Sequence, residues 1–241
     1  MKSHRFGAVL IIIGLMLGMS VAIGQPDSLW SRTYGGEGND TLWALIRSVE
    51  GGLAMTGYLT PEDTAAGQIC LIKTTANGNL SWMQTYGELA HEEGRDIKQT
   101  PDRGFVIVGY THSDPQDHQR RGLVYRTDSE GEEAWVRYLG ETEYSDAYSV
   151  VINEDRSFTV GGVFYPGGDW HDDLAFWKMD FSGNMQWMQH YGEREPSEYG
   201  LSLTSDPNGG YAIAGQRILF GEQGVEDGAA ILFRVDANGS Q

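Results

Sequence analysis

Residues 30–36 read WSRTYGG, and three later stretches repeat this phrase with small changes: WMQTYGE at 82–88, WVRYLGE at 135–141 and WMQHYGE at 187–193. The tryptophans that open the phrases are spaced by 52, 53 and 52 residues. A fixed period of roughly 50 residues is typical of repeat architectures, in which one structural unit recurs along the chain. We therefore divide the sequence into four repeat units, with bounds at 30–81, 82–134, 135–186 and 187–241.

Each unit contains four short runs with strand character. In the third unit the runs are Tyr148–Asn153, Phe158–Tyr165, Leu174–Asp180 and Met185–Tyr191. They are rich in β-branched and aromatic residues and are separated by turn-forming residues. A glycine recurs within the second run of each unit, at positions 57, 109, 162 and 215, and we expect it to let a neighbouring unit or a tryptophan pack on the backbone. A repeated four-stranded sheet of this size predicts an all-β fold of β-propeller type, with four four-stranded blades.

Two interpretations of the ends of the repeat region remain open. In one, the chain is the front portion of a larger propeller. In the other, the strand led by Trp30 is the outermost strand of the last blade, which closes the ring and removes its open edges. Hydrogen bonds between that strand and residues 230–236 would favour a closed small ring, and an exposed edge there would favour a fragment of a larger propeller.

The turns of the repeat carry a family resemblance. The turns EGG at 50–52, DRG at 102–104 and PNGG at 207–210, together with the phrase (K/R)-x-D-x-x-G-x-x-x-W, resemble the secreted bacterial β-propeller-like repeat proteins. Those proteins often end in a type IX secretion sorting domain. The resemblance covers residues 30–241 and implies architecture, without an established reaction or ligand. Residues 126–135 also resemble the repeat of quinoprotein propellers, which implies a structural analogue and not an activity.

The N-terminus has the order of a secretory signal. Lys2 and Arg5 precede an apolar run, residues 8–23, and a small residue, Gly24, follows. This order of a charged, an apolar and a small-residue region predicts a signal peptide over residues 1–24, with residues 25–241 as the β-propeller repeat domain. The apolar run is shorter than the roughly 20 residues that span a bilayer, so we expect no membrane insertion after signal removal.

Charge and cysteine content exclude several classes of protein. The chain has 34 acidic and 17 basic residues, a formal charge of −17, and removal of Lys2 and Arg5 makes it −19. Such a balance excludes a nucleic-acid partner, because phosphate contacts need clustered basic residues. Cys70 is the single cysteine, which excludes an intramolecular disulfide framework. An exported acidic protein of this kind is expected to be secreted or periplasmic in a bacterium.

An acidic residue recurs in each unit, as Asp40, Glu93, Asp146 and Glu198. In a propeller, the loops before the innermost strand and those between the second and third strands open on one face, and these acids would lie there near the central channel. Converging carboxylates repel one another unless they bind loop amides or share a cation. Ca²⁺ takes roughly six to eight oxygen ligands. A calcium site and a repeated turn-stabilising interaction are therefore the two interpretations of this acidic column, and the sequence establishes no cofactor besides this candidate.

Residues that break the repeat are the candidates for ligand binding. They lie in the second and third long loops: His112, Asp117, His118, Trp170, His171, Asp172 and Asp173. Trp170 would give an aromatic platform for a sugar ring, and the histidine and aspartate spacings match no recognised metal signature. The alternative is that these are solvated polar loops. The partner expected for such a surface is a glycan or a cell-surface protein.

Signatures of common enzymes are absent from the sequence. It contains no GxSxG, HExxH, Walker-type or dinucleotide-binding motif. We therefore predict a secreted, non-catalytic binding or scaffold module of β-propeller type. The alternatives are a carbohydrate-active enzyme that uses acidic loop residues, and a purely structural fragment of a larger propeller. Two carboxyl groups roughly 5–10 Å apart in a cleft lined by Trp170 would favour the enzyme.

Overall fold

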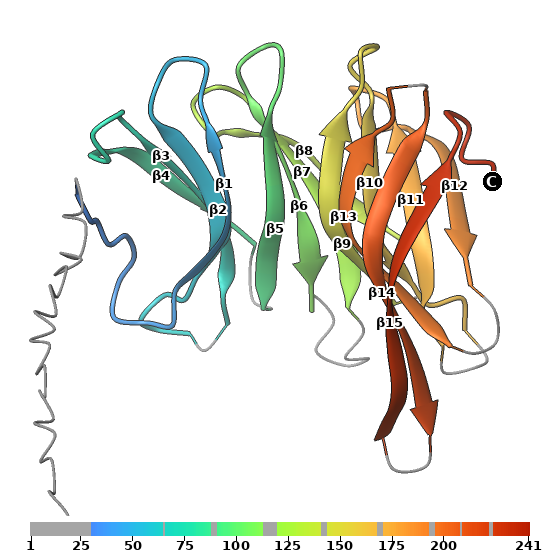
Figure 1. Ribbon diagram of the computed structural model, residues 1–241. Coiled ribbons are helices and arrows are strands. Elements are labelled where there is room, and N and C mark those ends of the chain that lie inside the picture. Colours follow the sequence, from blue (N-terminus) through green and yellow to red (C-terminus); the bar gives the residue numbers. More distant parts are fainter. Residues whose placement is uncertain are drawn as a thin grey trace, which may run out of the picture. The chain divides into compact units, whose positions relative to one another are not determined.

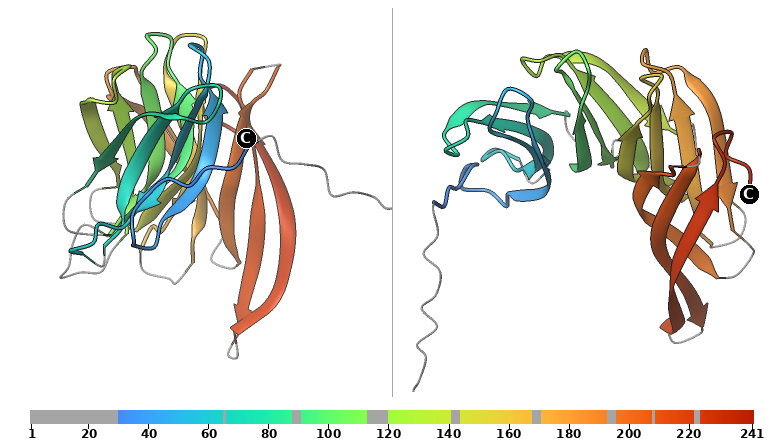
Figure 2. Two further views of the ribbon diagram at one scale, coloured as in Figure 1. Left: turned by 90° about the vertical axis from the view of Figure 1, so that its left-hand side faces the viewer. Right: turned by 45° about the horizontal axis from the view of Figure 1, so that its top comes forward.

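Four antiparallel sheets follow one another along the chain in the computed structural model (Figures 1 and 2). The structure describes residues 30–64, 66–87, 91–112, 120–140, 144–167, 171–192, 196–207, 209–221 and 224–241. The predicted signal peptide, residues 1–24, lies outside this part of the chain. Within the described ranges, no helix is both long and apolar enough to cross a membrane.

The first three sheets are four-stranded meanders, in which each strand pairs with the next along the chain. The first contains β1 (Thr41–Arg47), β2 (Leu53–Leu59), β3 (Gln68–Thr74) and β4 (Leu80–Tyr86). The second contains β5 (Glu92–Gln99), β6 (Phe105–Thr111), β7 (Arg121–Thr127) and β8 (Glu133–Leu139). The third contains β9 (Ser145–Ile152), β10 (Phe158–Phe164), β11 (Asp173–Met179) and β12 (Met185–Tyr191). The predicted all-β class is confirmed, and the strands predicted for the third unit agree closely with β9–β12.

The fourth sheet differs from the predicted four strands. It contains three in the described residues: β13 (Ser197–Ser205), β14 (Tyr211–Gly221) and β15 (Gly224–Val235). After β15 the chain makes the turn that elsewhere leads into a fourth strand, with the Asp236 carboxylate accepting 2.8 Å hydrogen bonds from the amides of Asn238 and Ser240. The hairpin β14–β15 is also longer than the others and extends beyond them in Figure 1.

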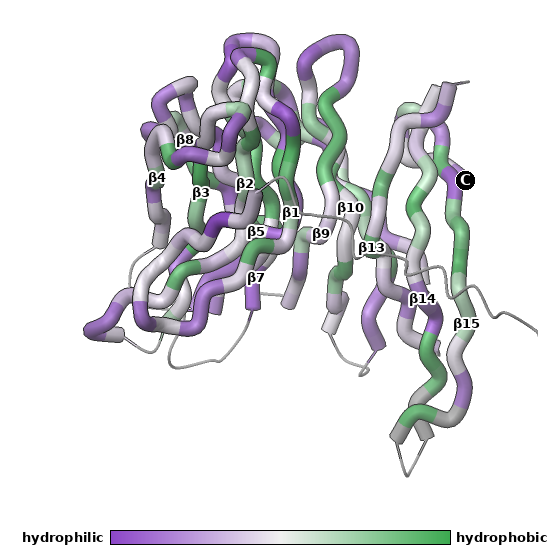
Figure 3. The backbone as a smooth tube through the Cα atoms, turned by 60° about the vertical axis from the view of Figure 1, so that its left-hand side comes forward, coloured by the Kyte–Doolittle hydropathy of each residue, from purple (hydrophilic) through white to green (hydrophobic). Residues whose placement is uncertain are grey.

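Consecutive sheets pack face to face through three apolar clusters. Leu71, Ile97 and Phe105 belong to the cluster between the first and second sheets. The cluster between the second and third sheets includes Val124, Val150 and Phe158, and the one between the third and fourth includes Phe176, Leu203 and Ile213. Figure 3 shows hydrophobic stretches within the strands and mainly hydrophilic turns. The core therefore lies between the sheets, as in a sandwich of aligned sheets.

The recurring tryptophans pack on glycines in the turns of the following sheet. A Cβ atom on Gly131 would lie 2.8 Å from the Trp82 ring, and one on Gly183 would lie 3.1 Å from the Trp135 ring. Both glycines also have positive φ, at 87° and 81°. Trp187 and Gly239 repeat the contact between the third and fourth sheets. The predicted role of the Trp column in packing between sheets is confirmed for these three tryptophans.

The glycines of the second strands do not have the predicted role of admitting a neighbouring unit or a tryptophan. A Cβ on Gly109 would lie 1.8 Å from the carbonyl oxygen of Glu93, and one on Gly162 would lie 2.0 Å from that of Asp146. These oxygens belong to the innermost strand of the same sheet, not to a neighbouring unit or a tryptophan. The close approach occurs beside a β-bulge, where one strand holds an extra residue against its partner. The glycine column therefore marks a bulge in each innermost strand.

Candidate functional site

Each innermost strand carries one bulged residue, which the pairing with the second strand leaves out. These residues are Trp43, Arg95, Tyr148 and Leu201, and we call them the bulge row. The Arg95 guanidinium lies 4.2 Å from the Trp43 ring centroid and 5.9 Å from that of Tyr148. Trp43 is 49% exposed. Because a bulge re-aims its side chain out of the regular pleat, three neighbouring sheets bring an indole, a guanidinium and a phenol together.

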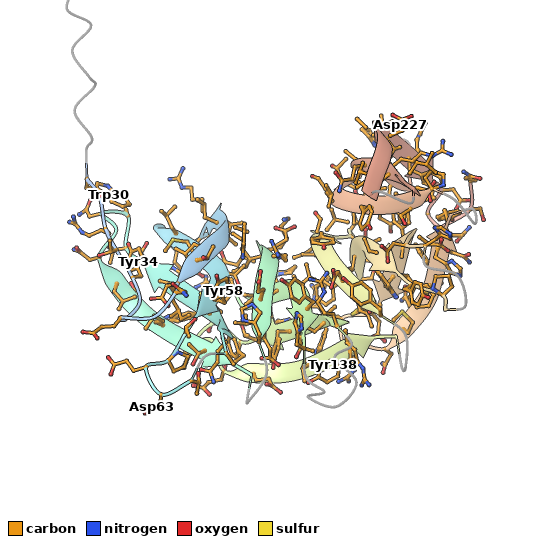
Figure 4. The ribbon with its side chains drawn as sticks, turned by 90° about the horizontal axis from the view of Figure 1, so that it is seen from below. Trp30, Tyr34, Tyr58, Asp63, Tyr138 and Asp227 are labelled. Carbon is orange, nitrogen blue, oxygen red and sulfur yellow. The ribbon has the colours of Figure 1, made fainter. Side chains whose placement is uncertain are left out.

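The loops of the predicted functional face do lie at one end of the sheets. The amide of Glu92, at the start of β5, donates a 2.8 Å hydrogen bond to the carbonyl of Gly67, which lies between β2 and β3. The amide of Glu198 donates a 2.7 Å bond to the carbonyl of Asp172, between β10 and β11. Figure 4 views this end, with Tyr58 labelled. The prediction that these loops share one face is confirmed.

The carboxylate of Glu93 forms an ion pair with Arg95 of the bulge row. This carboxylate lies 2.9 Å from the Arg95 guanidinium and 2.8 Å from Nε2 of His91. Burial by itself raises the pKa of Glu93, but hydrogen bonds from His91 and Tyr110 and the charge of Arg95 outweigh it, so the pKa is lowered. Glu93 is therefore a carboxylate at neutral pH and fixes the position of Arg95.

Asp146 occupies the corresponding place in the third sheet, in a more buried setting. It is 1% exposed, pairs with the Arg120 guanidinium, and accepts hydrogen bonds from the hydroxyls of Tyr148 (2.9 Å) and Tyr144 (3.2 Å). Burial raises the pKa of Asp146 to about 6, against the opposing effects of Arg120 and the two tyrosines. Since Tyr148 belongs to the bulge row, Asp146 anchors that side chain in turn.

Tyr110 joins the two carboxylate sites. Its hydroxyl accepts a 3.1 Å hydrogen bond from Arg95, and its ring centroid lies 4.5 Å from the Arg120 guanidinium. The result is a continuous set of paired charges and aromatic rings across the second and third sheets, Glu93, Arg95, Tyr110, Arg120 and Asp146, which we call the Arg–Tyr network. Its side chains are ordered by mutual contacts before any ligand binds.

The two remaining acids of the column have partners of their own. Asp40 accepts 2.9 Å hydrogen bonds from the amides of Gly36 and Thr60, the turn-stabilising role considered for the whole column. Glu198 lies 3.5 Å from Nε of Arg217. In the part of the chain that the structure describes, no three His, Cys, Asp or Glu residues gather as they would around a metal ion. A calcium ion shared by the acidic column stays a prediction.

The loop residues predicted to bind a ligand are partly dispersed. His112 lies beside the Arg–Tyr network, with its ring centroid 5.7 Å from that of Tyr110. Asp172 accepts a 2.6 Å hydrogen bond from Tyr199, and Asp173 lies 2.5 Å from Nδ1 of His190 on β12. His171 is partly buried. Asp117, His118 and Trp170 lie outside the described residues.

Sequence reasoning missed the bulge row itself. Its members differ in every unit, so they form no repeated column. A signal was available, because each of them follows the acid of its unit by two or three residues.

Known proteins were compared at the levels of sequence and structure. No family model and no curated protein matches the sequence. Solved structures do match. α-L-Arabinanase from Penicillium chrysogenum, solved with arabinobiose, gives a TM-score of 0.53 at 9% identity over 83% of this chain and 64% of that one. A Bacteroides caccae protein of unknown function gives 0.47 at 11% identity over 82% and 61%, and xylan β-1,4-xylosidase from Bacillus halodurans C-125 gives 0.45 at 13% over 84% and 42%.

The chain thus spans less than two thirds of each of these proteins. The identities are low, and the match with the arabinanase concerns the fold alone. With four consecutive antiparallel sheets whose innermost strands carry equivalent bulges, the chain is an all-β protein of β-propeller type.

Proposed function

We propose that this chain is a secreted, non-catalytic carbohydrate-binding module whose binding surface is the bulge row. The observation that carries the proposal is the stack of Arg95 on the half-exposed ring of Trp43, at 4.2 Å. An indole face accepts the apolar side of a sugar ring, while a fixed guanidinium donates hydrogen bonds to its hydroxyl groups. Export is supported by the signal-like leader and by the resemblance of the repeats to secreted bacterial proteins.

A neutral oligosaccharide fits this surface better than an anionic one. The chain carries a formal charge of −17, so its overall field repels anions. Arg95 and Arg120, the cations of the network, are already paired with Glu93 and Asp146. Each of these ion pairs has no net charge, but its guanidinium group can still donate hydrogen bonds to a ligand. Arabinobiose, named with the arabinanase of similar fold, makes arabino-oligosaccharides the first probe.

The buried state of Asp146 supports binding over catalysis. A general acid must come within hydrogen-bond reach of the glycosidic oxygen. Asp146 is 1% exposed and pairs with Arg120. A sugar lying on Trp43 and Arg95 therefore contacts the outer side of the network and not this carboxyl group.

Calorimetric titration of the exported protein with neutral arabino- and xylo-oligosaccharides tests the proposal. Trp43→Ala is expected to weaken binding at least tenfold, because it removes the stacking surface. Tyr138→Ala is the matched control, since Tyr138 is 48% exposed and lies on β8, at the opposite edge of the second sheet from β5, which carries Arg95. Equal losses in both variants, or no binding by the unsubstituted protein, would contradict the proposal.

A carbohydrate-active enzyme is the second candidate, and the pKa values of two acids favour it. The pKa of Glu93 is lowered, while burial raises that of Asp146 to about 6. Carboxyl groups whose pKa values are pushed apart are typical of an acid and base pair. Chromatography of arabino-oligosaccharides after long incubation with the protein distinguishes binding from hydrolysis. The binding proposal predicts intact substrate, whereas products that disappear with Asp146→Asn would establish the enzyme.

A further inference from the structure

Two arginines in the second and third sheets make the same set of contacts. In each set, the Nη2 nitrogen of the guanidinium group pairs with a carboxylate and donates a hydrogen bond to a tyrosine hydroxyl. The sets are Arg95 with Glu93 and Tyr110, and Arg120 with Asp146 and Tyr144. The arrangement of an acid, an arginine and a tyrosine is therefore present twice within the Arg–Tyr network and its immediate surroundings.

The two acids hold the same place in their sheets, but the two arginines do not. Glu93 and Asp146 each directly precede the residue that pairs with the glycine of the second strand. Arg95 is the bulged residue of β5. Arg120 instead lies just before β7, in the second sheet, and reaches across to Asp146 in the third. The sequence repeat accounts for the acids alone, and the same contacts around each arginine arise from two different elements of the fold.

Both guanidinium groups keep a donor for a ligand. The side chains of Arg95 and Arg120 are 22% and 25% exposed. Their Nε atoms are buried, and within the described ranges every hydrogen bond and ion pair of the two groups is made by Nη2. The Nη1 nitrogen of each arginine is therefore the one that can donate to a hydroxyl group of a bound molecule.

Each guanidinium group also lies beside an aromatic ring of its own. Arg95 is 4.2 Å from the ring centroid of Trp43, and Arg120 is 5.0 Å from that of Tyr144. The two arginines share a third ring, since they lie 5.3 and 4.5 Å from the centroid of Tyr110. Because both contact this one tyrosine, they are close enough for linked rings of a single oligosaccharide to meet both.

We propose that Arg95 and Arg120 form two adjacent sugar subsites, so that the ligand is a linear neutral oligosaccharide lying across the second and third sheets. This inference rests on the proposed function and adds the length and course of the ligand. One sugar ring stacks on Trp43 and accepts a hydrogen bond from Nη1 of Arg95. A further ring of the same chain accepts one from Nη1 of Arg120, beside Tyr144. A single sugar fills only one of the two subsites.

Calorimetric titration of the unsubstituted protein with arabinose, arabinobiose and arabinotriose tests the proposal. The affinity is expected to rise roughly tenfold or more from the single sugar to the trisaccharide, because the longer ligand gains hydrogen bonds from a second charged donor. Equal affinities for the single sugar and the trisaccharide would overturn the two subsites and leave the proposed function standing. An absence of binding at every length, with the xylo-oligosaccharides as well, would overturn both.

Arg120→Lys locates the second subsite, because lysine keeps a positive charge beside Asp146 but has no Nη1 donor. The gain with chain length is expected to disappear, so that the trisaccharide binds about as tightly as the single sugar. Arg217→Lys is the matched control, since Arg217 lies beside an acid, Glu198, in the fourth sheet. A full gain in Arg120→Lys, or its loss in Arg217→Lys, would overturn the proposal. If Arg120→Lys does not fold, Tyr144→Leu replaces it under the same criterion.

Discussion

The hydroxyl of Tyr86, at the end of β4, donates a 2.6 Å hydrogen bond to the carbonyl of Gly131 in the second sheet. That glycine also lies under the Trp82 ring. One turn glycine thus receives both an indole and a phenol from the preceding sheet. Tyr191 bonds Gly239 in the same way between the third and fourth sheets. Between the second and third sheets, Nε of Arg137 donates the corresponding 3.1 Å hydrogen bond to the carbonyl of Gly183.

Tyr86→Phe is expected to destabilise the protein by about 1–2 kcal/mol, because it leaves a buried carbonyl without its donor. Urea denaturation followed by circular dichroism measures the change. Tyr138→Phe, at a half-exposed position of the next sheet, should change the free energy of unfolding by less than about 0.5 kcal/mol. Equal effects at the two positions would show that the bond to Gly131 contributes nothing specific.

Gly109→Ala should be more harmful, since its Cβ would lie 1.8 Å from the carbonyl oxygen of Glu93. Overpacking of this kind costs about 2–3 kcal/mol, and here it opposes the bulge that positions Arg95. Gly36→Ala is the control, because nothing lies within 4 Å of the added methyl group and its φ is not positive. Thermal melts of the two variants should differ clearly, and similar melting temperatures would contradict the assigned role of Gly109.

Deprotonation of Asp146 should make the free energy of unfolding fall as the pH rises from about 4 to 6. The pKa of Asp146 is raised from 3.8 to about 6 in the folded protein, so between these values the folded state holds a proton that the unfolded state has lost. A difference of this size corresponds to about 3 kcal/mol. Denaturation across this range should show the decline in the unsubstituted protein, and Asp146→Asn should flatten it. If the free energy of unfolding of the variant declined with the same slope, the decline would come from other titrating groups and not from Asp146.

Glu93→Gln should weaken oligosaccharide binding roughly tenfold, or about 1.4 kcal/mol, because the lost ion pair releases Arg95 from its position over Trp43. Glu198→Gln is the matched control, since Glu198 faces Arg217 in the fourth sheet. Calorimetry on both variants measures the effect. If Glu198→Gln weakens binding as much as Glu93→Gln does, the specific role of the Glu93–Arg95 pair is refuted.

The period of the sequence predicted the sheets well because it depends on local properties. Strand-forming runs and turn residues recur in every unit, and the predicted packing of the tryptophans between sheets is present for Trp82, Trp135 and Trp187. The glycines that these rings contact, Gly131, Gly183 and Gly239, lie in turns and are not the second-strand glycines for which the contact was predicted.

The period of the sequence does not reveal the bulge row, because its members differ from unit to unit. A bulge depends on the pairing of two strands: Gly94 and Asp96 of β5 pair with consecutive residues of β6, and Arg95 between them has no partner there. The sequence of β5 alone does not show which of its residues is left unpaired. The sequence predicted that Gly109 packs against another unit. The atom that requires a glycine there is instead the Glu93 carbonyl oxygen, in the neighbouring strand of the same sheet.

The most direct test of the carbohydrate-binding proposal is a crystal structure of the protein with its tightest-binding neutral oligosaccharide. We predict a sugar ring stacked on the Trp43 indole, with a hydroxyl group within hydrogen-bond distance of the Arg95 guanidinium. A sugar bound at the long loops or on the β14–β15 hairpin, with the Trp43 ring left uncovered, would contradict the assignment of the bulge row as the binding surface.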